Sequence, residues 1–267
     1  MSRLVSTILL FLALMQFNLF VNPAGAEGHH PFWPGEKMHF VLKYGPIPAG
    51  TATLEVHDMD KIKDVEAYHF VLTARSNSFI DIFFKVRDRI DSYTDTGMNH
   101  SLYYKKDQKE GKTRRYIRVD FDWEKKESTY VNFDTEPKTI SLMPGTFDPL
   151  SVFYYSRLLD LQEEEEFEHP VTDGEKNLMG ILRVIGREKV SVPAGTYETF
   201  VLEPDMKNVE NVFSKKQRAK TTLWVTNDER RLLVQMQSEA VVGSFFAELV
   251  EIEGHNSKQV SSLKNTQ

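Results

Sequence analysis

The sequence predicts an all-β protein with one or two short helices, built as a large, strongly curved antiparallel sheet or an incomplete β-barrel. Apolar and polar residues alternate in at least eleven segments, turn-forming sequences separate these segments, and one segment has helical spacing instead. A sheet with this many strands has to curl or split, because neighbouring strands twist relative to one another. We therefore expect residues 27–255 to form a single β-rich domain.

The clearest strand covers residues 113–123. Ile117, Val119 and Phe121 share one face, whereas the residues between them are charged. This pattern is typical of an antiparallel strand with one buried and one solvated face. Similar alternation predicts strands at residues 38–44, 51–57, 68–74, 86–93, 101–105, 129–133, 178–192, 197–203, 220–226, 231–237 and 241–251.

One segment has the spacing of a helix. Asp148 can cap its start, and Pro149 suits the first helical position, where no N–H is needed. Apolar residues at helical spacing then predict a helix over residues 149–161 that packs against the sheet. Residues 78–84 can form a second short helix, although their apolar residues fit either period.

Both ends of the chain differ from the middle. Residues 1–26 have a positively charged residue near their start, continue with an apolar stretch and end with small residues. This pattern predicts an export signal that is cleaved after Ala26. An uncleaved membrane anchor is the alternative. Residues 256–267 are polar and predict a disordered tail, and residues 161–175 form the best break between two β halves. The mature chain has no apolar stretch long enough for a transmembrane segment, and we expect it in the periplasm.

Composition limits the chemistry. The 267 residues include no cysteine, which excludes disulfides, thiolate metal sites and thiol nucleophiles. The formal net charge of −6 makes nucleic acid a poor partner, because phosphate backbones require a concentrated positive surface. Two basic clusters, at residues 105–115 and 215–220, can meet anionic lipid headgroups. Lysines that protect sheet edges are the simpler interpretation of these clusters.

The sequence Pro-Ala-Gly-Thr occurs twice, at residues 48–51 and 193–196, each time at the start of an expected strand. Proline fixes φ and glycine adopts backbone angles that other residues resist, so each copy predicts a tight turn. A duplicated half-barrel would explain the repetition, but two independent uses of one turn are the simpler interpretation.

Short motifs occur in a fixed order along almost the whole mature chain. They are Gly35-Glu36 with Phe40 and Tyr44; Gly45-Pro46-Ile47-Pro48-Ala49-Gly50-Thr51-Ala52; Val86-Arg87-Asp88 with Ser92-Tyr93; Phe147-Asp148-Pro149-Leu150-Ser151 with Tyr154-Tyr155 and Arg157; Gly186-Arg187-Glu188 with residues 192–196; and Leu223-Trp224-Val225 with Asp228-Glu229-Arg230-Arg231. This ordered set resembles the bacterial exported family called Domain of Unknown Function 3108. The resemblance implies export and an antiparallel β fold, and it brings no catalytic residues.

The sequence lacks the motifs of common catalytic centres. None of its eight histidines forms a zinc-binding pattern, no Gly-x-Ser-x-Gly motif occurs, and the Ser-x-x-Lys match at residues 261–264 lies in the polar tail. Asp120 and Asp122 share a strand face, where ion pairs with Arg114 and Arg118 are the simplest expectation. We expect no enzyme, no metal and no cofactor.

Aromatic and apolar side chains are the candidates for a binding site. The larger set that can fill or line the interior is Phe79, Ile82, Phe83, Phe84, Phe121, Trp123, Phe153, Tyr154, Tyr155, Trp224, Phe245 and Phe246. The ligand-binding candidates selected from it are Phe121, Trp123, Phe153, Tyr154, Trp224 and Phe245. A packed core is the alternative for the same residues, because sequence does not separate a filled interior from a lipid pocket.

These observations favour a periplasmic, non-enzymatic binding or carrier protein for an apolar or amphipathic envelope ligand, a lipid or glycolipid. The alternative is a cell-envelope module with a solid core that holds a protein or polysaccharide partner. A hydrolase with a site assembled from distant residues is a remote third hypothesis.

Overall fold

The computed structural model describes residues 30–205, 220–240 and 243–254. The predicted signal with its cut at Ala26, the tail at 256–267 and most of the second basic cluster lie outside these ranges. Among the described residues, no helix is long and apolar enough to cross a membrane.

The described residues form fourteen strands and two short helices. The strands are β1 (Lys37–Tyr44), β2 (Ile47–Ile62), β3 (Val65–Ser76), β4 (Arg87–Asp95), β5 (Ser101–Glu110), β6 (Thr113–Asp122), β7 (Glu127–Asn132), β8 (Lys138–Ser141), β9 (Glu166–Thr172), β10 (Asn177–Val192), β11 (Gly195–Asp205), β12 (Lys220–Thr226), β13 (Leu233–Ala240) and β14 (Gly243–Glu253). The helices are α2 (Ser78–Asp81) and α3 (Pro149–Ser156).

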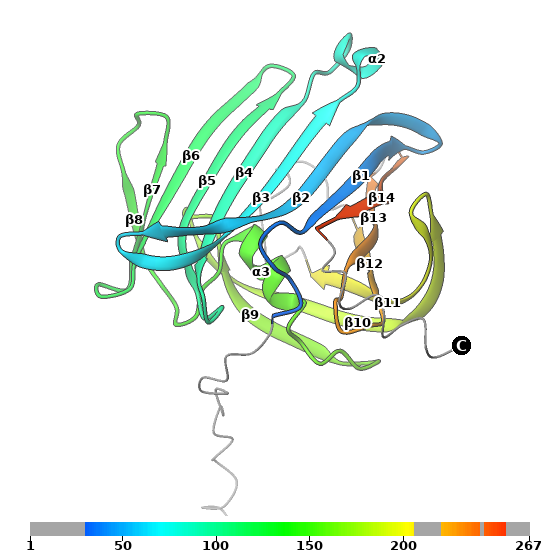
Figure 1. The fold of residues 1–267 in the computed structure, drawn as a ribbon. Coiled ribbons are helices and arrows are strands. Elements are labelled where there is room, and N and C mark those ends of the chain that lie inside the picture. Colours follow the sequence, from blue (N-terminus) through cyan, green and yellow to red (C-terminus); the bar gives the residue numbers. More distant parts are fainter. Residues whose placement is uncertain (1–29, 206–219, 241–242, 255–267) are drawn as a thin grey trace, which may run out of the picture.

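All fourteen strands belong to one antiparallel sheet in the order β8-β7-β6-β5-β4-β3-β2-β1-β14-β13-β12-β11-β10-β9. The first and last strands of the chain pair in the middle of the sheet, and the sheet curves so that its two halves face each other (Figure 1). The edge strands β8 and β9 are not paired with one another, so the barrel is incomplete. This architecture confirms the predicted all-β fold class.

The two edges of the sheet nevertheless lie close together. Phe147, in the connection after β8, forms an isolated parallel bridge with Val171 of β9. Lys138 on β8 forms an ion pair with Glu175, which follows β9, at 3.1 Å. The predicted break at residues 161–175 overlaps β9, so it lies where the sheet remains open rather than between two separate halves.

The strands β8 and β9 were not predicted. In β9, acidic residues and Pro170 obscure the alternation. Both features suit an edge strand, where charge and proline discourage further pairing.

Helix α3 is shorter than the predicted 149–161. It begins after Asp148 and ends at Ser156, and single turns follow it, such as Leu158 N–H to the Tyr155 carbonyl at 2.9 Å. The second predicted helix is the four-residue α2.

The two Pro-Ala-Gly-Thr sequences occupy different positions. Residues 193–194 form the tight β10–β11 turn, as predicted. The first copy lies inside β2, after a turn at residues 45–46, and Gly50 is needed there for close packing. A Cβ on Gly50 would lie 2.1 Å from the carbonyl oxygen of Arg75.

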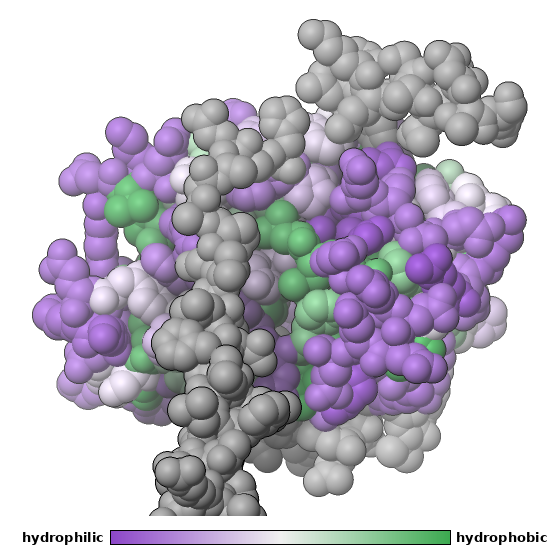
Figure 2. Space-filling view, turned by 90° about the horizontal axis from the view of Figure 1, so that it is seen from below, coloured by the Kyte–Doolittle hydropathy of each residue, from purple (hydrophilic) through white to green (hydrophobic). Residues whose placement is uncertain are grey.

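The core lies on the face of the sheet that packs against α3, which we call the inner face. Phe70 of β3 and Tyr154 of α3 are fully buried and stack with ring centroids 3.9 Å apart. A second cluster surrounds Val119 and Phe121 on β6. Seen from the side opposite to α2, hydrophobic residues reach the surface in separate patches among hydrophilic ones (Figure 2).

Candidate functional site

Helix α3 is anchored to the sheet by Asp148, which is completely buried. Its Oδ1 accepts hydrogen bonds from the backbone N–H groups of Leu150 and Ser151, at 2.9 and 3.0 Å. Its Oδ2 accepts hydroxyl hydrogen bonds from Ser92 of β4, Ser101 of β5 and Ser151, at 2.8, 2.6 and 2.6 Å. Burial raises the pKa of Asp148, and these hydrogen bonds oppose the rise. One carboxyl group therefore caps the helix and ties it to two strands.

A buried ion pair holds the other end of α3. Arg157 donates to Glu36 through Nη1 at 2.5 Å and through Nη2 at 3.0 Å, and both side chains are at most 1% exposed. The same guanidinium donates to the backbone carbonyls of Pro31, at 2.7 Å, and Arg230, at 2.9 Å. It therefore connects the N-terminal segment, α3 and the turn before β13.

The inner face is filled beside α3 and becomes exposed away from it. On β3, Phe70 is 0% exposed, whereas Leu72, two residues nearer α2, is partly exposed. On β14, Leu249 is 0% exposed, Ala247 is 6% and Phe245 is 47%. The partly exposed apolar residues of the inner face towards α2 are Leu42, Ala52, Leu72, Ile90, Leu223 and Met236.

Charged residues continue this face on β4 and β5. Ile90 packs in the core, so alternation places Asp88 on the inner face, and Lys106 lies directly opposite Ile90 in the register. Burial and a hydrogen bond with Glu110 raise the pKa of Asp88 to about 6. Burial also lowers the pKa of Lys106, while Glu110 and Asp88 act against that shift. The inner face therefore changes from apolar to charged at β4–β5.

A buried acceptor lies next to this charged cluster. Gln108 Oε1 is buried and accepts no hydrogen bond from the described residues. Gln108 also borders a surface pocket of about 270 Å³. The pocket is lined by Asp107, Gln108, Lys109, Arg114, Arg115, Tyr116 and Phe133. Asp107 and Tyr116 alternate along their strands with Lys106 and Ile117, so this pocket opens mainly on the outer face of β5 and β6, behind the charged cluster.

Four of the six predicted ligand-binding residues belong to the filled part of the molecule. Phe121 is 4% exposed, and Tyr154 is fully buried. Trp123 is partly buried and donates its indole N–H to the Ser101 carbonyl at 2.8 Å. On α3, Phe153 is partly exposed and packs against the main core.

The structure separates the other two candidates. Leu223 packs in the main core, so its neighbour Trp224 points to the opposite face of β12, where it donates to Glu188 at 3.2 Å. Phe245 lies on the same face as Ala247 and is exposed at the α2 end of β14. The structure therefore places the six residues in different environments rather than around one cavity.

Residues 79–84 do not fill the interior, contrary to the expectation from sequence. Phe79, Ile82, Phe83 and Phe84 are all more than half exposed. They belong to the β3–β4 connection, which projects beyond the sheet (Figure 1).

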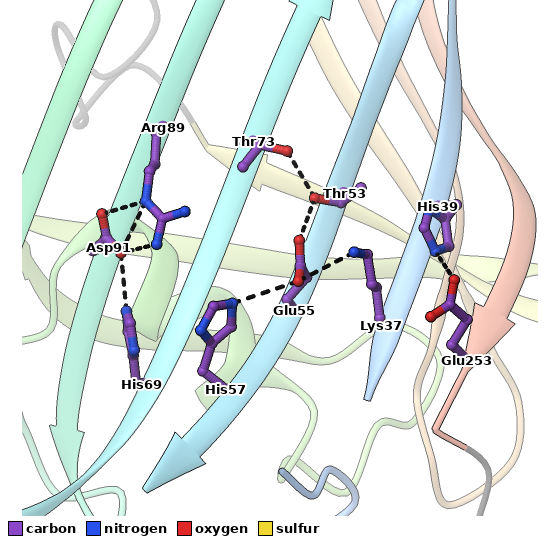
Figure 3. A network of polar contacts seen from close by, with 10 residues as sticks. All are labelled: Lys37, His39, Thr53, Glu55, His57, His69, Thr73, Arg89, Asp91 and Glu253. Carbon is purple, nitrogen blue, oxygen red and sulfur yellow. Dashed lines mark hydrogen bonds and ion pairs between the residues drawn. The ribbon is translucent and has the colours of Figure 1, made fainter. Parts of the chain in front are cut away.

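The outer face carries a network of polar contacts (Figure 3). Asp91 accepts hydrogen bonds from His69, at 3.0 Å, and from Arg89, at 2.6 Å. Burial alone would raise the pKa of Asp91, but the hydrogen bonds from His69 and Arg89 outweigh it and lower that pKa well below its usual range.

A second part of the network lies on β1 and β2. Glu55 lies 3.4 Å from both Lys37 Nζ and His57 Nε2. Burial alone would raise the pKa of Glu55. The hydrogen bond from the Thr53 hydroxyl and the positive charge of Lys37 outweigh burial, so the pKa of Glu55 is lowered. Within the part of the chain that the structure describes, no group of three or more acidic or histidine residues can hold a metal ion. This network connects neighbouring strands, and its geometry does not define a reaction centre.

The predicted partners of two acidic residues on β6 are wrong. Asp120 pairs with Lys63 at 3.6 Å, and Asp122 pairs with Lys125 at 2.9 Å. Arg114 instead donates to backbone carbonyls at the β5–β6 turn. The lysines lie in the turns at the same end of the sheet as the two acids, which places them within reach.

The model of the family described as "Protein of unknown function (DUF3108)" matches residues 39–250. The chain belongs to the DUF3108 family. No curated protein matches this DUF3108 chain. Several residues of the motifs given above, Glu36, Ser92, Asp148, Ser151 and Arg157, are the ones that fasten α3 to the sheet. Sequence alone did not reveal this role, because the partners lie far apart along the chain.

Solved structures with low sequence identity resemble this chain to different degrees. A β-barrel-like protein of the DUF1849 family from Brucella abortus is 10% identical, with a TM-score of 0.54, covering 84% of this chain and 98% of that one. A candidate exported protein with a YmcC-like fold from Bacteroides fragilis is 10% identical, with a TM-score of 0.39, covering 84% and 98%. A candidate lipoprotein from Parabacteroides distasonis is 9% identical, with a TM-score of 0.35, covering 82% and 95%. The likeness to the Brucella protein concerns the fold alone.

Proposed function

We propose that this DUF3108 protein is an exported, non-enzymatic binding protein for an amphipathic envelope molecule, a lipid or glycolipid. The observation that carries the proposal is the exposure of the apolar inner face towards α2, together with the charged cluster at its margin. The export signal predicted at residues 1–26 supports a periplasmic location.

The apolar part of the ligand would lie on the inner face between α3 and the α2 end. Leu72 and Met236 come from opposite halves of the curved sheet, and both are partly exposed on that face. Each methylene group removed from water contributes about 0.8 kcal/mol. An acyl chain held between the two halves would therefore gain enough free energy to offset the cost of ordering it.

The polar part of the ligand would lie at β4–β6. Lys106 and Arg115 can attract an anionic headgroup, and Gln108 offers a buried amide oxygen to a hydroxyl donor. The carboxyl group of Asp88, which forms a hydrogen bond with Glu110, favours a ligand that brings hydroxyl groups as well as charge.

Native mass spectrometry of the mature protein purified from its own periplasm tests the proposal. We expect a stoichiometric lipid or glycolipid, and we expect Leu72→Gln and Met236→Gln to reduce its occupancy about tenfold. Ile185→Gln is the matched control, because Ile185 is already 50% exposed. A protein that is purified without ligand and takes up no fluorescent lipid analogue would contradict the proposal.

A second candidate function is supported by the filled end of the molecule. The stacked Phe70 and Tyr154 and the buried Glu36–Arg157 pair form a solid core around α3. If the inner face binds nothing, a cell-envelope module that holds a protein or polysaccharide on its surface becomes the better interpretation. Affinity capture by the immobilised mature protein, with Lys112→Glu as the comparison, would test it.

A further inference from the structure

An exposed apolar tip lies at one end of the molecule, formed by α2 and the residues after it. Ile82 and Phe83 are 76% and 75% exposed, and Phe79 and Phe84 are 59% and 51% exposed. Single exposed apolar residues are ordinary, but four within six residues of one projecting connection form a continuous patch that indicates a partner. Phe79 and Phe83 contact each other, with ring centroids 5.8 Å apart.

The base of this tip is rigidly held. Arg87 forms a two-pronged ion pair with Asp81, at 3.1 and 2.6 Å, and also donates to the Ser76 carbonyl at 3.2 Å. Asn77 caps α2 by accepting from Ile80 N–H at 2.9 Å. The apolar side chains are therefore presented by a fixed scaffold, and little ordering is required when a partner binds.

The tip is continuous with a basic hairpin. Gly111, in the β5–β6 turn, donates to the Lys85 carbonyl at 2.9 Å, and a Cβ on Gly111 would lie 2.6 Å from the Phe84 ring. Residues 75–88 and 106–115 contain eight lysines and arginines but only four carboxylates, although the whole chain has a net charge of −6. The apolar tip and the excess positive charge thus form one surface.

We propose that this surface docks the protein on a membrane that contains anionic lipids. Phe83 and Ile82 would enter the headgroup region, while Lys85 and Lys112 would contact lipid phosphates. A second copy of the chain is a poorer occupant, because symmetric contact through the tip would bring two basic hairpins together. The inference goes beyond ligand binding, since the inner face can hold a ligand whether or not the tip meets a membrane.

Co-flotation of the mature protein with vesicles tests this docking. We expect binding to vesicles of phosphatidylcholine with phosphatidylglycerol, and much weaker binding to phosphatidylcholine alone. The double variant Ile82→Ser/Phe83→Ser should lose at least tenfold in affinity. The affinity of the double variant Lys85→Glu/Lys112→Glu for these vesicles should fall at least fivefold per replaced charge at low salt, and by less at high salt.

Matched controls lie elsewhere on the surface. Ile185→Ser removes an apolar side chain that is 50% exposed, and Lys61→Glu reverses an exposed charge at the other end of β2, so neither should change vesicle binding. All variants should retain the thermal unfolding midpoint of the parent, because the altered residues are exposed.

Two outcomes would overturn the inference. One is equal flotation of the parent and the Ile82→Ser/Phe83→Ser variant. The other is self-association of the parent in solution that the same variant abolishes, which would assign the tip to a second copy. Ligand occupancy measured by native mass spectrometry on the tip variants separates docking from inner-face binding, since only docking should be lost.

Discussion

Replacing Glu36 with glutamine tests whether the buried ion pair fastens α3 to the rest of the fold. The change keeps the size of the side chain and one acceptor oxygen, but it removes the negative charge that faces Arg157. Both side chains are at most 1% exposed, so water does not replace the lost partner. The guanidinium would keep its hydrogen bonds to the Pro31 and Arg230 carbonyls while its charge remained buried.

The expected cost follows from this geometry. Removing one partner of a buried pair destabilises a protein by about 3–5 kcal/mol, and the remaining hydrogen bonds favour the lower end of that range. A loss of about 3 kcal/mol is a large share of the 5–15 kcal/mol by which domains are usually stable. For a domain of this size, it corresponds to a fall of about 6–12 °C in Tm.

Urea unfolding monitored by tryptophan fluorescence measures the change. Glu198→Gln is the control, because Glu198 pairs with Lys189 on the surface, where both side chains are about two-thirds exposed. We expect no measurable change in that variant. Hydrogen exchange adds a local readout, since Glu36→Gln should speed exchange in α3 more than in β6. If Glu36→Gln is as stable as Glu198→Gln, the pair does not anchor the helix and the reasoning is refuted.

Two further predictions concern carboxyl groups whose pKa is raised by burial. Asp148→Ala removes a helix cap and leaves the hydroxyls of Ser92 and Ser101 without their acceptor, so we expect a loss of about 3 kcal/mol in urea unfolding. A loss below about 1 kcal/mol would contradict this role. The pKa of Asp88 is raised from 3.8 to about 6 in the folded state, so the folded protein holds this proton more tightly than the unfolded chain does. The contribution of Asp88 to the free energy of unfolding is therefore fully present below pH 3.8 and is lost as the pH rises through about 6. Asp88→Asn should therefore remove this fall and raise stability at pH 7 by about 1 kcal/mol, a value reduced for the partial exposure of the group. If the free energy of unfolding changes with pH in the same way for the parent and for Asp88→Asn, the raised pKa of Asp88 is not the cause of the change.

Much of the fold could be predicted from alternation, but the site could not. Residues on β6 alternate between apolar and charged, so strand and buried face are both evident from the sequence. Lys106 gives no comparable signal, because the residues around it on β5 are polar on both faces. The exposure of Phe83 was missed for a related reason, since an apolar side chain predicts burial unless the neighbouring elements fail to reach it. The elements that lie near Phe83 depend on how β3 pairs with β4, and the local sequence does not specify this pairing.

The length of α3 decides how much of the inner face is covered. Eight helical residues extend about 12 Å, whereas the sixteen residues of β2 extend about 50 Å. Whatever its orientation, a helix of this length covers only part of the inner face. The predicted helix over residues 149–161 would have been about 20 Å long. Leu72 and Met236 lie on the part of the inner face that stays partly exposed, while Asp148 and Arg157 keep the covered part solid. The same short helix thus explains both the rigid core around α3 and the apolar surface that we propose as the ligand site.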